Sequence, residues 1–224
     1  FVALNVFRYL TFRTGGAVVT ALAISFFLGP KIIDFLKNRQ KWEQPIRSDG
    51  PESHILSKKG IPTMGGVLIL FALSIATLLW AKLTNPFVWV SLGITAAFGT
   101  IGFMDDYLKV TQRNSGGLSG KLKLVMQVSI AAIVTIWISQ ILPPELKSTL
   151  AVPFFKTILI DLSWVFILFS IIVIVGASNS VNLTDGLDGL AIVPVMIAAG
   201  VFALIAYLVG NAVFSNYLQL HYVP

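Results

Sequence analysis

Two short acidic runs contain the residue types in this sequence that could do chemistry. One is the pair Asp105-Asp106, which directly follows an apolar stretch, and the other is NLTDGLDGL, from Asn182 to Leu190. In the second run Asp185 and Asp188 lie three residues apart, a spacing that places them on one face of a helix, and a glycine follows each. Carboxylates at the end of a membrane segment are costly unless they are paired or functional. Both runs are therefore candidate sites, and the Asp105-Asp106 pair suits Mg²⁺, a hard cation that takes oxygen ligands.

Each run also has a purely structural interpretation. NLTDGLDGL could be a polar turn in which Thr184 or Asp185 caps the next helix, and residue types alone leave that interpretation as open as the functional one. The pair Asp105-Asp106 could be exposed acids at the end of a helix. That interpretation is energetically less favourable, because acids at a helix C-terminus interact unfavourably with the helix dipole.

Lysines accompany the acids. Lys109 follows the pair by one turn, within reach of the pair or of a phosphate, and Lys121 follows the run NSGGLSG (114–120), which has the composition of a flexible linker. Lys58 precedes a helix start that could hold an anion, although an ordinary solvated basic loop fits the same residues. Enzymes that catalyse phosphoryl transfer use acids, Mg²⁺ and lysines. The sequence contains such acids and lysines, and it has no cysteine and no promising Ser-His pair.

The composition places the chain outside the soluble class. Hydrophobic residues make up 56% and charged residues 12%, and the mean hydropathy is +0.84, values typical of an integral membrane protein. The formal net charge of +6 does not indicate a nucleic-acid partner, because the basic residues lie in loops between apolar runs. No cysteine is present, which excludes a disulfide framework and a thiolate metal site.

Uncharged runs close to the length of about 20 residues that spans a membrane recur along the chain and predict an all-α fold, a polytopic transmembrane helical bundle. We expect one integral membrane domain with six helices, at about 14–36, 61–81, 84–104, 122–142, 162–180 and 189–209. Between the fourth and fifth helices, the segment 143–161 is long enough for an element of its own. An interfacial helix or a hairpin fits it, and it shows no chemistry.

The distribution of Lys and Arg predicts which side of the membrane each loop faces. The segments 31–59 and 105–123 hold 11 of the 16 basic residues, and the opposite side holds five, so the two basic loops should be cytoplasmic. Four tryptophans fall near the other ends of their helices, as an aromatic belt would: Trp80, Trp89, Trp137 and Trp164. The run Asn182–Leu190 should share the cytoplasmic face, where acids at the membrane surface would meet a lipid and a cytoplasmic phosphate ester.

Three runs also carry a specific resemblance. PESHILSKKGIPTMGG, GFMDDYLKV and NLTDGLDGLA resemble the signature runs of the phospho-N-acetylmuramoyl-pentapeptide transferase (MraY) family, in that family's order and at its spacings. The resemblance extends from about Asn5 to the end of the chain. It implies a multi-pass enzyme of the bacterial inner membrane, with about ten helices and its active face in the cytoplasm. Such an enzyme transfers phospho-N-acetylmuramoyl-pentapeptide from its UDP carrier to undecaprenyl phosphate, forming lipid I and UMP in peptidoglycan synthesis, with Mg²⁺.

The resemblance assigns roles to individual acids. Asp105 and Asp106 match the family's paired catalytic aspartates, one of which acts as base on the lipid phosphate or helps to hold the metal. Asp188 matches another acid of the active-site cleft. These residues are therefore the expected catalytic set, with Asp105 and Asp106 as the expected metal ligands.

The resemblance also implies a set of substrate-binding residues. Asn182 and Asp185 match positions on the nucleotide side of the cleft, and Thr63 sits beside the family's basic residues. The full expected set is Lys58, Thr63, Lys109, Lys121, Asn182 and Asp185. The expected partners are undecaprenyl phosphate, UDP-N-acetylmuramoyl-pentapeptide and membrane lipid, without nucleic acid, and a homodimer is compatible with the family.

Two features of the family are absent before Pro224: a later loop with a further aspartate (FMGD) and a final histidine-rich loop. That aspartate is the family's metal ligand, so the metal site within these 224 residues should be incomplete. The sequence also begins at Phe1 and not at a methionine. We therefore interpret the chain as a fragment cut at both ends, with about four helices missing and without activity by itself.

Two other functions remain to be weighed. A sibling polyprenyl-phosphate sugar-1-phosphate transferase that uses UDP-N-acetylglucosamine would share the Asp pair and the Asp-Gly run but not PESHILSKKGIPTMGG. An ion-coupled transporter would place its acids deep within helices, whereas here nearly all fall at the expected helix ends.

Overall fold

A computed structural model describes residues 2–39, 63–112, 116–152, 155, 158–185 and 189–223. The chain divides into two compact units, Phe1–Ile130 and Ala131–Pro224. Each unit is described by itself.

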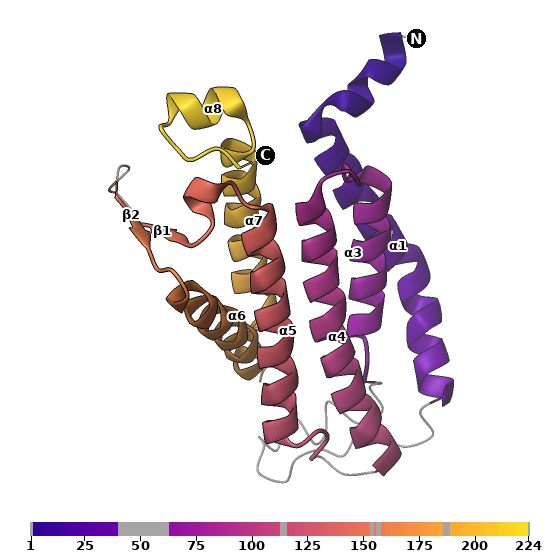
Figure 1. Cartoon of the computed structure of the whole chain (residues 1–224). Coiled ribbons are helices and arrows are strands. Elements are labelled where there is room, and N and C mark those ends of the chain that lie inside the picture. The colour runs from indigo at the N-terminus through magenta and orange to yellow at the C-terminus, as the bar shows by residue number, and fades with distance from the viewer. Residues whose placement is uncertain are drawn as a thin grey trace. The chain divides into compact units, whose positions relative to one another are not determined.

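The first unit is built from long apolar helices. A short 3-10 helix, η1 (Val2–Arg8), leads into α1 (Leu10–Arg39), and α3 (Gly66–Trp80) and α4 (Pro86–Gln112) follow. In Figure 1, α1, α3 and α4 lie side by side, and α1 packs on α3 as α3 packs on α4. The unit closes with the first half of α5 (Gly120–Ile141).

The second unit combines helices with a small hairpin. After α5 come η2 (Pro144–Leu146), β1 (Thr149–Ala151) and β2 (Leu159–Asp161), and the two strands pair antiparallel with Leu150 opposite Ile160. The hairpin confirms the second of the two elements expected for 143–161. The helices α6 (Val165–Thr184), α7 (Ile192–Val209) and α8 (Ala212–Tyr217) complete the unit.

Asp161 joins the hairpin to α6. Its Oδ1 accepts hydrogen bonds from the Ser148 hydroxyl (2.6 Å) and from the backbone N–H of Ser163 (2.8 Å). These bonds, the Ser148 bond first, hold the pKa of Asp161 below its usual value.

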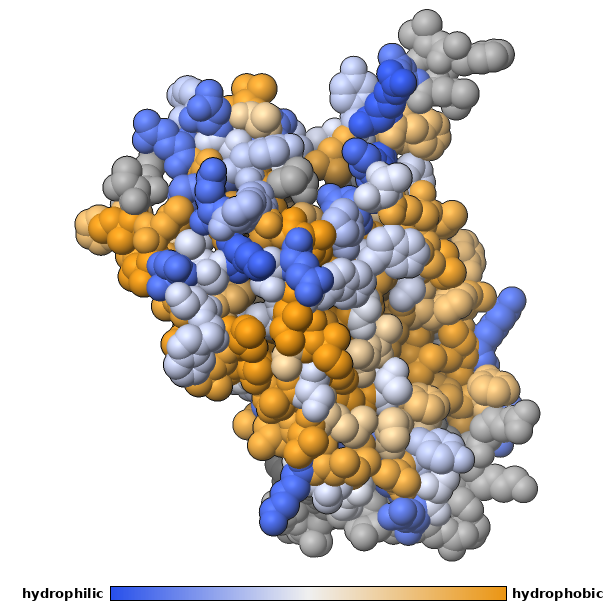
Figure 2. Space-filling model, in the orientation of Figure 1, coloured by the Kyte–Doolittle hydropathy of each residue, from blue (hydrophilic) through white to orange (hydrophobic). Residues whose placement is uncertain are grey.

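The helices are long and apolar enough to cross a membrane. Among the described residues, α1, α4, α5, α6 and α7 reach the length and hydropathy of a span, and apolar residues cover the sides of the helices in Figure 2. Many large apolar side chains are exposed, among them Phe26 and Phe202, each more than 70% exposed. Because such exposure is unfavourable in water, the fold is the expected polytopic helical bundle in lipid.

Two helices have bounds that matter for the site. α4 continues to Gln112, eight residues beyond the expected end at 104, so Asp105 and Asp106 lie within its last two turns rather than after it. α3 begins at Gly66, after a turn in which Met64 has a φ of 69°, whereas the expected helix began near 61. The 15 residues of α3 extend about 22 Å, less than the roughly 30 Å of a bilayer's hydrocarbon core.

Candidate active site

Asp105 is held on both of its carboxylate oxygens. Oδ1 accepts the backbone N–H of Leu118 at 2.8 Å, and Oδ2 accepts the ammonium of Lys109, one turn later in α4, at 2.6 Å. The residue is only 9% exposed. A buried carboxylate is stable only when it is paired and hydrogen-bonded, and here both conditions are met. The exposed helix-end interpretation is therefore wrong for Asp105.

Asp106 has a more open environment. The hydroxyl of Thr63, 43 positions earlier in the chain, donates to its Oδ2 at 3.2 Å, and the ammonium of Lys109 lies 3.5 Å from its Oδ1. The side chain is 33% exposed. Lys109 therefore links the two acids, as expected from its spacing, while Asp106 keeps access to a reactant.

A glycine in the loop after α4 makes the Asp105 site possible. Gly117 has a φ of +57°, and a Cβ at this position would collide with Oδ1 of Asp105 and would lie 2.8 Å from Cε of Lys109. Only glycine adopts such a φ freely while the backbone approaches so closely. The linker interpretation of 114–120 is thus wrong for its described residues 116–120, which fold back to bring Leu118 N–H onto Asp105.

The basic residues divide between described and undescribed positions. Lys109 joins the acids, whereas Lys121 is exposed on the first turn of α5. Lys58 lies outside the described residues. The structure therefore brings Thr63, Lys109 and the acid pair together and leaves Lys121 apart from their hydrogen bonds.

The second acidic run lies at the end of α6. Asn182 is exposed on the last turn, and exposed Asp185 is the C-cap residue, whose N–H bonds the carbonyl of Val181 at 3.1 Å. The helix-cap interpretation is wrong, because α7 begins after Ala191 without a side-chain cap. Gly189 has a φ of +83°, as expected of a glycine in this run.

Asp188 lies outside the described residues, and the two acidic runs belong to different units. Their convergence into one cleft therefore stays a prediction.

The acid pair fits part of a Mg²⁺ site. Carboxylate oxygens are the ligands that Mg²⁺ prefers, and it commonly takes one or two from the protein and the rest from water and substrate phosphates. Within the described ranges, no cluster of three or more His, Cys, Asp or Glu residues is present. The Asp106 carboxylate is the better placed ligand, because its side chain is 33% exposed, whereas Asp105 is buried with hydrogen bonds on both oxygens.

The position of the pair along α4 places it near the membrane surface. Asp106 follows Trp89 by 17 residues in one continuous helix, which corresponds to about 25 Å along the helix axis. If Trp89 marks one interface, the pair lies close to the other boundary of a hydrocarbon core about 30 Å thick. A lipid headgroup can reach that depth.

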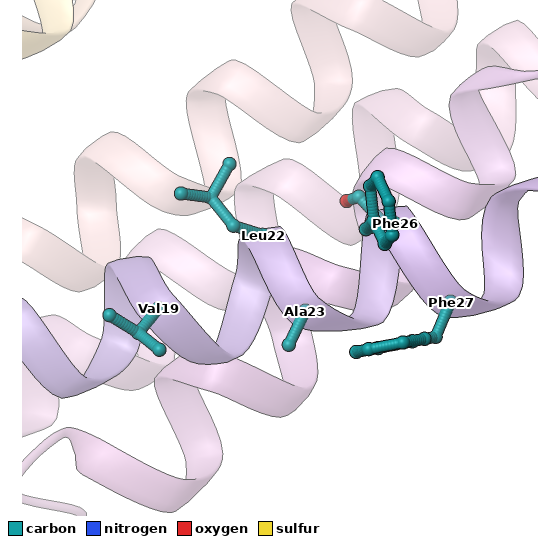
Figure 3. A pocket seen from close by; sticks show the side chains of 6 residues that line it. Val19, Leu22, Ala23, Phe26 and Phe27 are labelled. Atoms are coloured by element: carbon teal, nitrogen blue, oxygen red, sulfur yellow. The ribbon is translucent and has the colours of Figure 1, made fainter.

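An apolar depression on α1 offers no comparable chemistry. Its volume is about 620 Å³, and it is lined by five apolar side chains and Ser25. Figure 3 shows Val19, Leu22, Ala23, Phe26 and Phe27 on this one helix. No titratable group lines it, so we interpret it as lipid-facing surface.

Comparison with known proteins identifies the family of the chain. The family model of Glycosyl transferase family 4 matches residues 88–221, and Phospho-N-acetylmuramoyl-pentapeptide-transferase signature 1 matches residues 58–70. The phospho-N-acetylmuramoyl-pentapeptide-transferase of Granulibacter bethesdensis is 58% identical over 223 residues, which cover 100% of this chain and 62% of the relative. The chain thus spans less than two thirds of that relative's length. The family match includes Asp105, Asp106, Lys109 and Asp185. Because it extends over more than half of the sequence, the chain belongs to glycosyl transferase family 4, and it also carries the MraY signature.

Proposed function

We propose that the full-length protein transfers phospho-N-acetylmuramoyl-pentapeptide from UDP to undecaprenyl phosphate, forming lipid I and UMP. One observation carries this proposal. Thr63 lies within the MraY signature match and donates its hydroxyl hydrogen to Asp106. One residue of the signature match therefore belongs to the same cluster as the acid pair, and this favours the muramoyl substrate over UDP-N-acetylglucosamine.

The cluster has the groups that phosphoryl transfer requires. In the proposed step an oxygen of undecaprenyl phosphate attacks the phosphorus bonded to the sugar, the pyrophosphate P–O bond breaks, and UMP leaves with the bond's electrons. The partly exposed Asp106 carboxylate orients the attacking phosphate and accepts its proton if it arrives protonated. The Lys109 ammonium neutralises charge on the phosphoryl oxygens, and its contacts with both acids fix its position.

Asp105 acts through Lys109 in this scheme. Its two oxygens are occupied by Lys109 and by Leu118 N–H, so it orients the lysine and does not itself bind substrate. A bound Mg²⁺, held at Asp106 and by the substrate phosphates, would supply further neutralisation of charge.

The remaining expected residues complete the proposal. Asn182 and Asp185 would bind the nucleotide side of the UDP substrate, and Lys58 and Lys121 would bind its phosphates. Asp188 would act as a further catalytic acid of the cleft. The protein would act at the cytoplasmic face of a bacterial inner membrane, and a homodimer is compatible with the family.

A membrane assay tests the proposal. Membranes that contain the full-length protein should release UMP from UDP-N-acetylmuramoyl-pentapeptide only when undecaprenyl phosphate is added. Release without the lipid would indicate hydrolysis instead of transfer. An ion-coupled transporter would release no UMP at all.

A further inference from the structure

The end of the first unit opposite the acid pair contains a second group of charged residues. A cavity of about 320 Å³ lies there between the start of α1, the end of α3 and the connection to α4, and Arg13 and Lys82 line it. Its volume is at the lower end of the range of small-ligand pockets. Trp80, the last residue of α3, forms part of its wall.

Arg13 is positioned but not neutralised. Its Nε donates to the backbone carbonyl of Trp80 at 2.5 Å, where the C-terminal end of a helix favours a cation. That bond uses one of the five N–H donors of a guanidinium. In the part of the chain that the structure describes, neither Arg13 nor Lys82 forms an ion pair, so both cations can take an anion.

No described carboxylate of this unit lies at this end. Its described acids are Asp34, Asp105 and Asp106. Asp34 is 21 residues beyond Arg13 along α1, about 32 Å along the axis, and the acid pair is in the last two turns of α4. Arg8, Arg13 and Lys82 therefore form a local excess of positive charge on the side where the positive-inside bias predicts few cations.

Several contacts hold the cavity wall in place. The indole N–H of Trp80 donates to the hydroxyl of Thr20 at 2.9 Å, and its ring stacks on Phe7 at 5.9 Å with an interplanar angle of 12°. A Cβ at Gly16 would approach the Trp80 ring to 2.5 Å, so this glycine lets α1 pack closely against it. A wall that such contacts order before binding lowers the cost of binding.

From these observations we infer that Arg13 and Lys82 form a binding site for the phosphodiester headgroup of an anionic phospholipid. The planar guanidinium of Arg13 can hold two phosphate oxygens, and Lys82 adds a compact charge. The lipid source follows from the surroundings: Trp80 and Trp89 mark this end of the helices as a membrane interface, and Leu10 and Val88 add apolar surface to the same cavity. The site is distinct from the proposed transfer site and does not depend on it.

Native mass spectrometry of the full-length protein in mild detergent tests this inference. The delipidated protein is titrated with phosphatidylglycerol and with phosphatidylcholine of identical acyl chains. We expect the wild type to bind the first lipid more tightly, and Arg13→Gln with Lys82→Gln to lower that preference by about tenfold. The matched control, Lys147→Gln with Lys156→Gln, also removes two cations expected on this side and should keep the preference.

Because Arg13 also bonds the Trp80 carbonyl, Lys82→Gln alone serves as the variant that leaves this internal contact intact. It should weaken the preference for phosphatidylglycerol by about threefold. An unchanged preference in Lys82→Gln, or an equal loss in the control, would overturn the site. Displacement of the lipid by millimolar glycerol 3-phosphate would show that the cavity takes a soluble phosphate, which would overturn the lipid assignment.

Discussion

Asp105 and Asp106 are adjacent in sequence but differ in environment because successive side chains of a helix point about 100° apart. One direction leads to the loop at Leu118, and the other leads to Thr63. Lys109 stands at i+4 from the first acid and at i+3 from the second, the two spacings that meet on a helix surface, and it contacts both. The pair therefore combines a buried anchor with an accessible acid.

This difference predicts distinct kinetic effects in the full-length protein. Asp106→Asn should mainly lower kcat, by about a hundredfold or more, because the lost group acts on charge that develops in the transition state. Asp105 and Asp188 should also be needed for turnover. Asp185→Asn should mainly raise KM for the UDP substrate, because a contact equal in ground and transition states affects binding alone.

The measurement uses purified protein at saturating Mg²⁺ with both substrates varied. An Asp106→Asn enzyme with near-normal kcat would remove the pair from the reaction.

Gly117→Ala should also lower kcat, by about tenfold or more, because its methyl group would displace Asp105 and Lys109 and a misplacement of about 1 Å can cost a hundredfold. Gly120→Ala is the matched control, since a Cβ at Gly120 meets nothing within 4 Å. Steady-state kinetics of both variants, with their thermal unfolding measured beside them, check this. Equal effects of the two substitutions would show that the loop does not position the acids.

The sequence predicted part of this cluster. Asp105, Asp106 and Lys109 are predictable from residue type, because charged side chains at a membrane boundary are costly unless they are paired. Thr63 is predictable only from the resemblance to the family. The role of Leu118 was not predictable, because a backbone N–H leaves no signal in residue type. The composition around Gly117 is typical of a linker, because composition does not show that the turn packs against Asp105 and Lys109.

At the scale of elements, α3 is a short helix held at both ends. Arg13 binds the carbonyl of Trp80 at its last residue, and Thr63, three residues before Gly66, bonds Asp106. Because about 22 Å of helix is shorter than the hydrocarbon core, these polar contacts satisfy groups that lie near or within the membrane boundary. α3 thus fixes Thr63 at a defined depth beside the pair.

Close packing of α1 on α3 can be tested with neighbouring glycines. Gly16→Ala should lower the unfolding temperature in detergent, at a cost of about 1–3 kcal/mol, the usual range for overpacking, because its methyl group meets the Trp80 ring. Gly15→Ala should leave stability unchanged or raise it slightly, since nothing lies within 4 Å of a Cβ there and alanine favours a helix. A Gly16→Ala protein as stable as the wild type would contradict this packing.

Apolar runs predicted where the five long helices and the shorter α3 of the described residues lie, but not where they end. A hydrophobic run records the part of a helix that lies in lipid, whereas the backbone of α4 stays helical through Asp105-Asp106 to Gln112. The start of α3 was displaced for the opposite reason, because Met64 adopts a left-handed conformation before the helix begins. Neither the C-terminal end of α4 nor the N-terminal end of α3 has a sequence signal as strong as that of an apolar run.

At the scale of the whole molecule, the proposed function requires that the acidic runs of both units face the same side of the membrane. The excess of Lys and Arg in 31–59 and 105–123 supports that orientation. In the first unit, the Thr63–Asp106 bond already joins the ends of the first two motif loops. The third loop, at the end of α6, belongs to the second unit.

Single cysteines test the orientation directly, because the chain contains no native cysteine. Cysteines at Ser48, Ser115 and Ser180 should react with a membrane-impermeant maleimide only when the cytoplasmic face is accessible. Labelling of any of the three from the periplasmic side of intact cells would refute the shared face.

The most direct test of the central claim is transfer by the purified full-length protein in lipid nanodiscs. The protein is given undecaprenyl phosphate and either UDP-N-acetylmuramoyl-pentapeptide or UDP-N-acetylglucosamine, each labelled in the sugar, and the lipid and nucleotide products are separated. We predict labelled lipid I and an equal amount of UMP with the muramoyl substrate, little product with UDP-N-acetylglucosamine, and loss of both products in Asp106→Asn. Efficient transfer of N-acetylglucosamine phosphate in place of the muramoyl substrate, or no lipid-linked product from either, would contradict the proposed function.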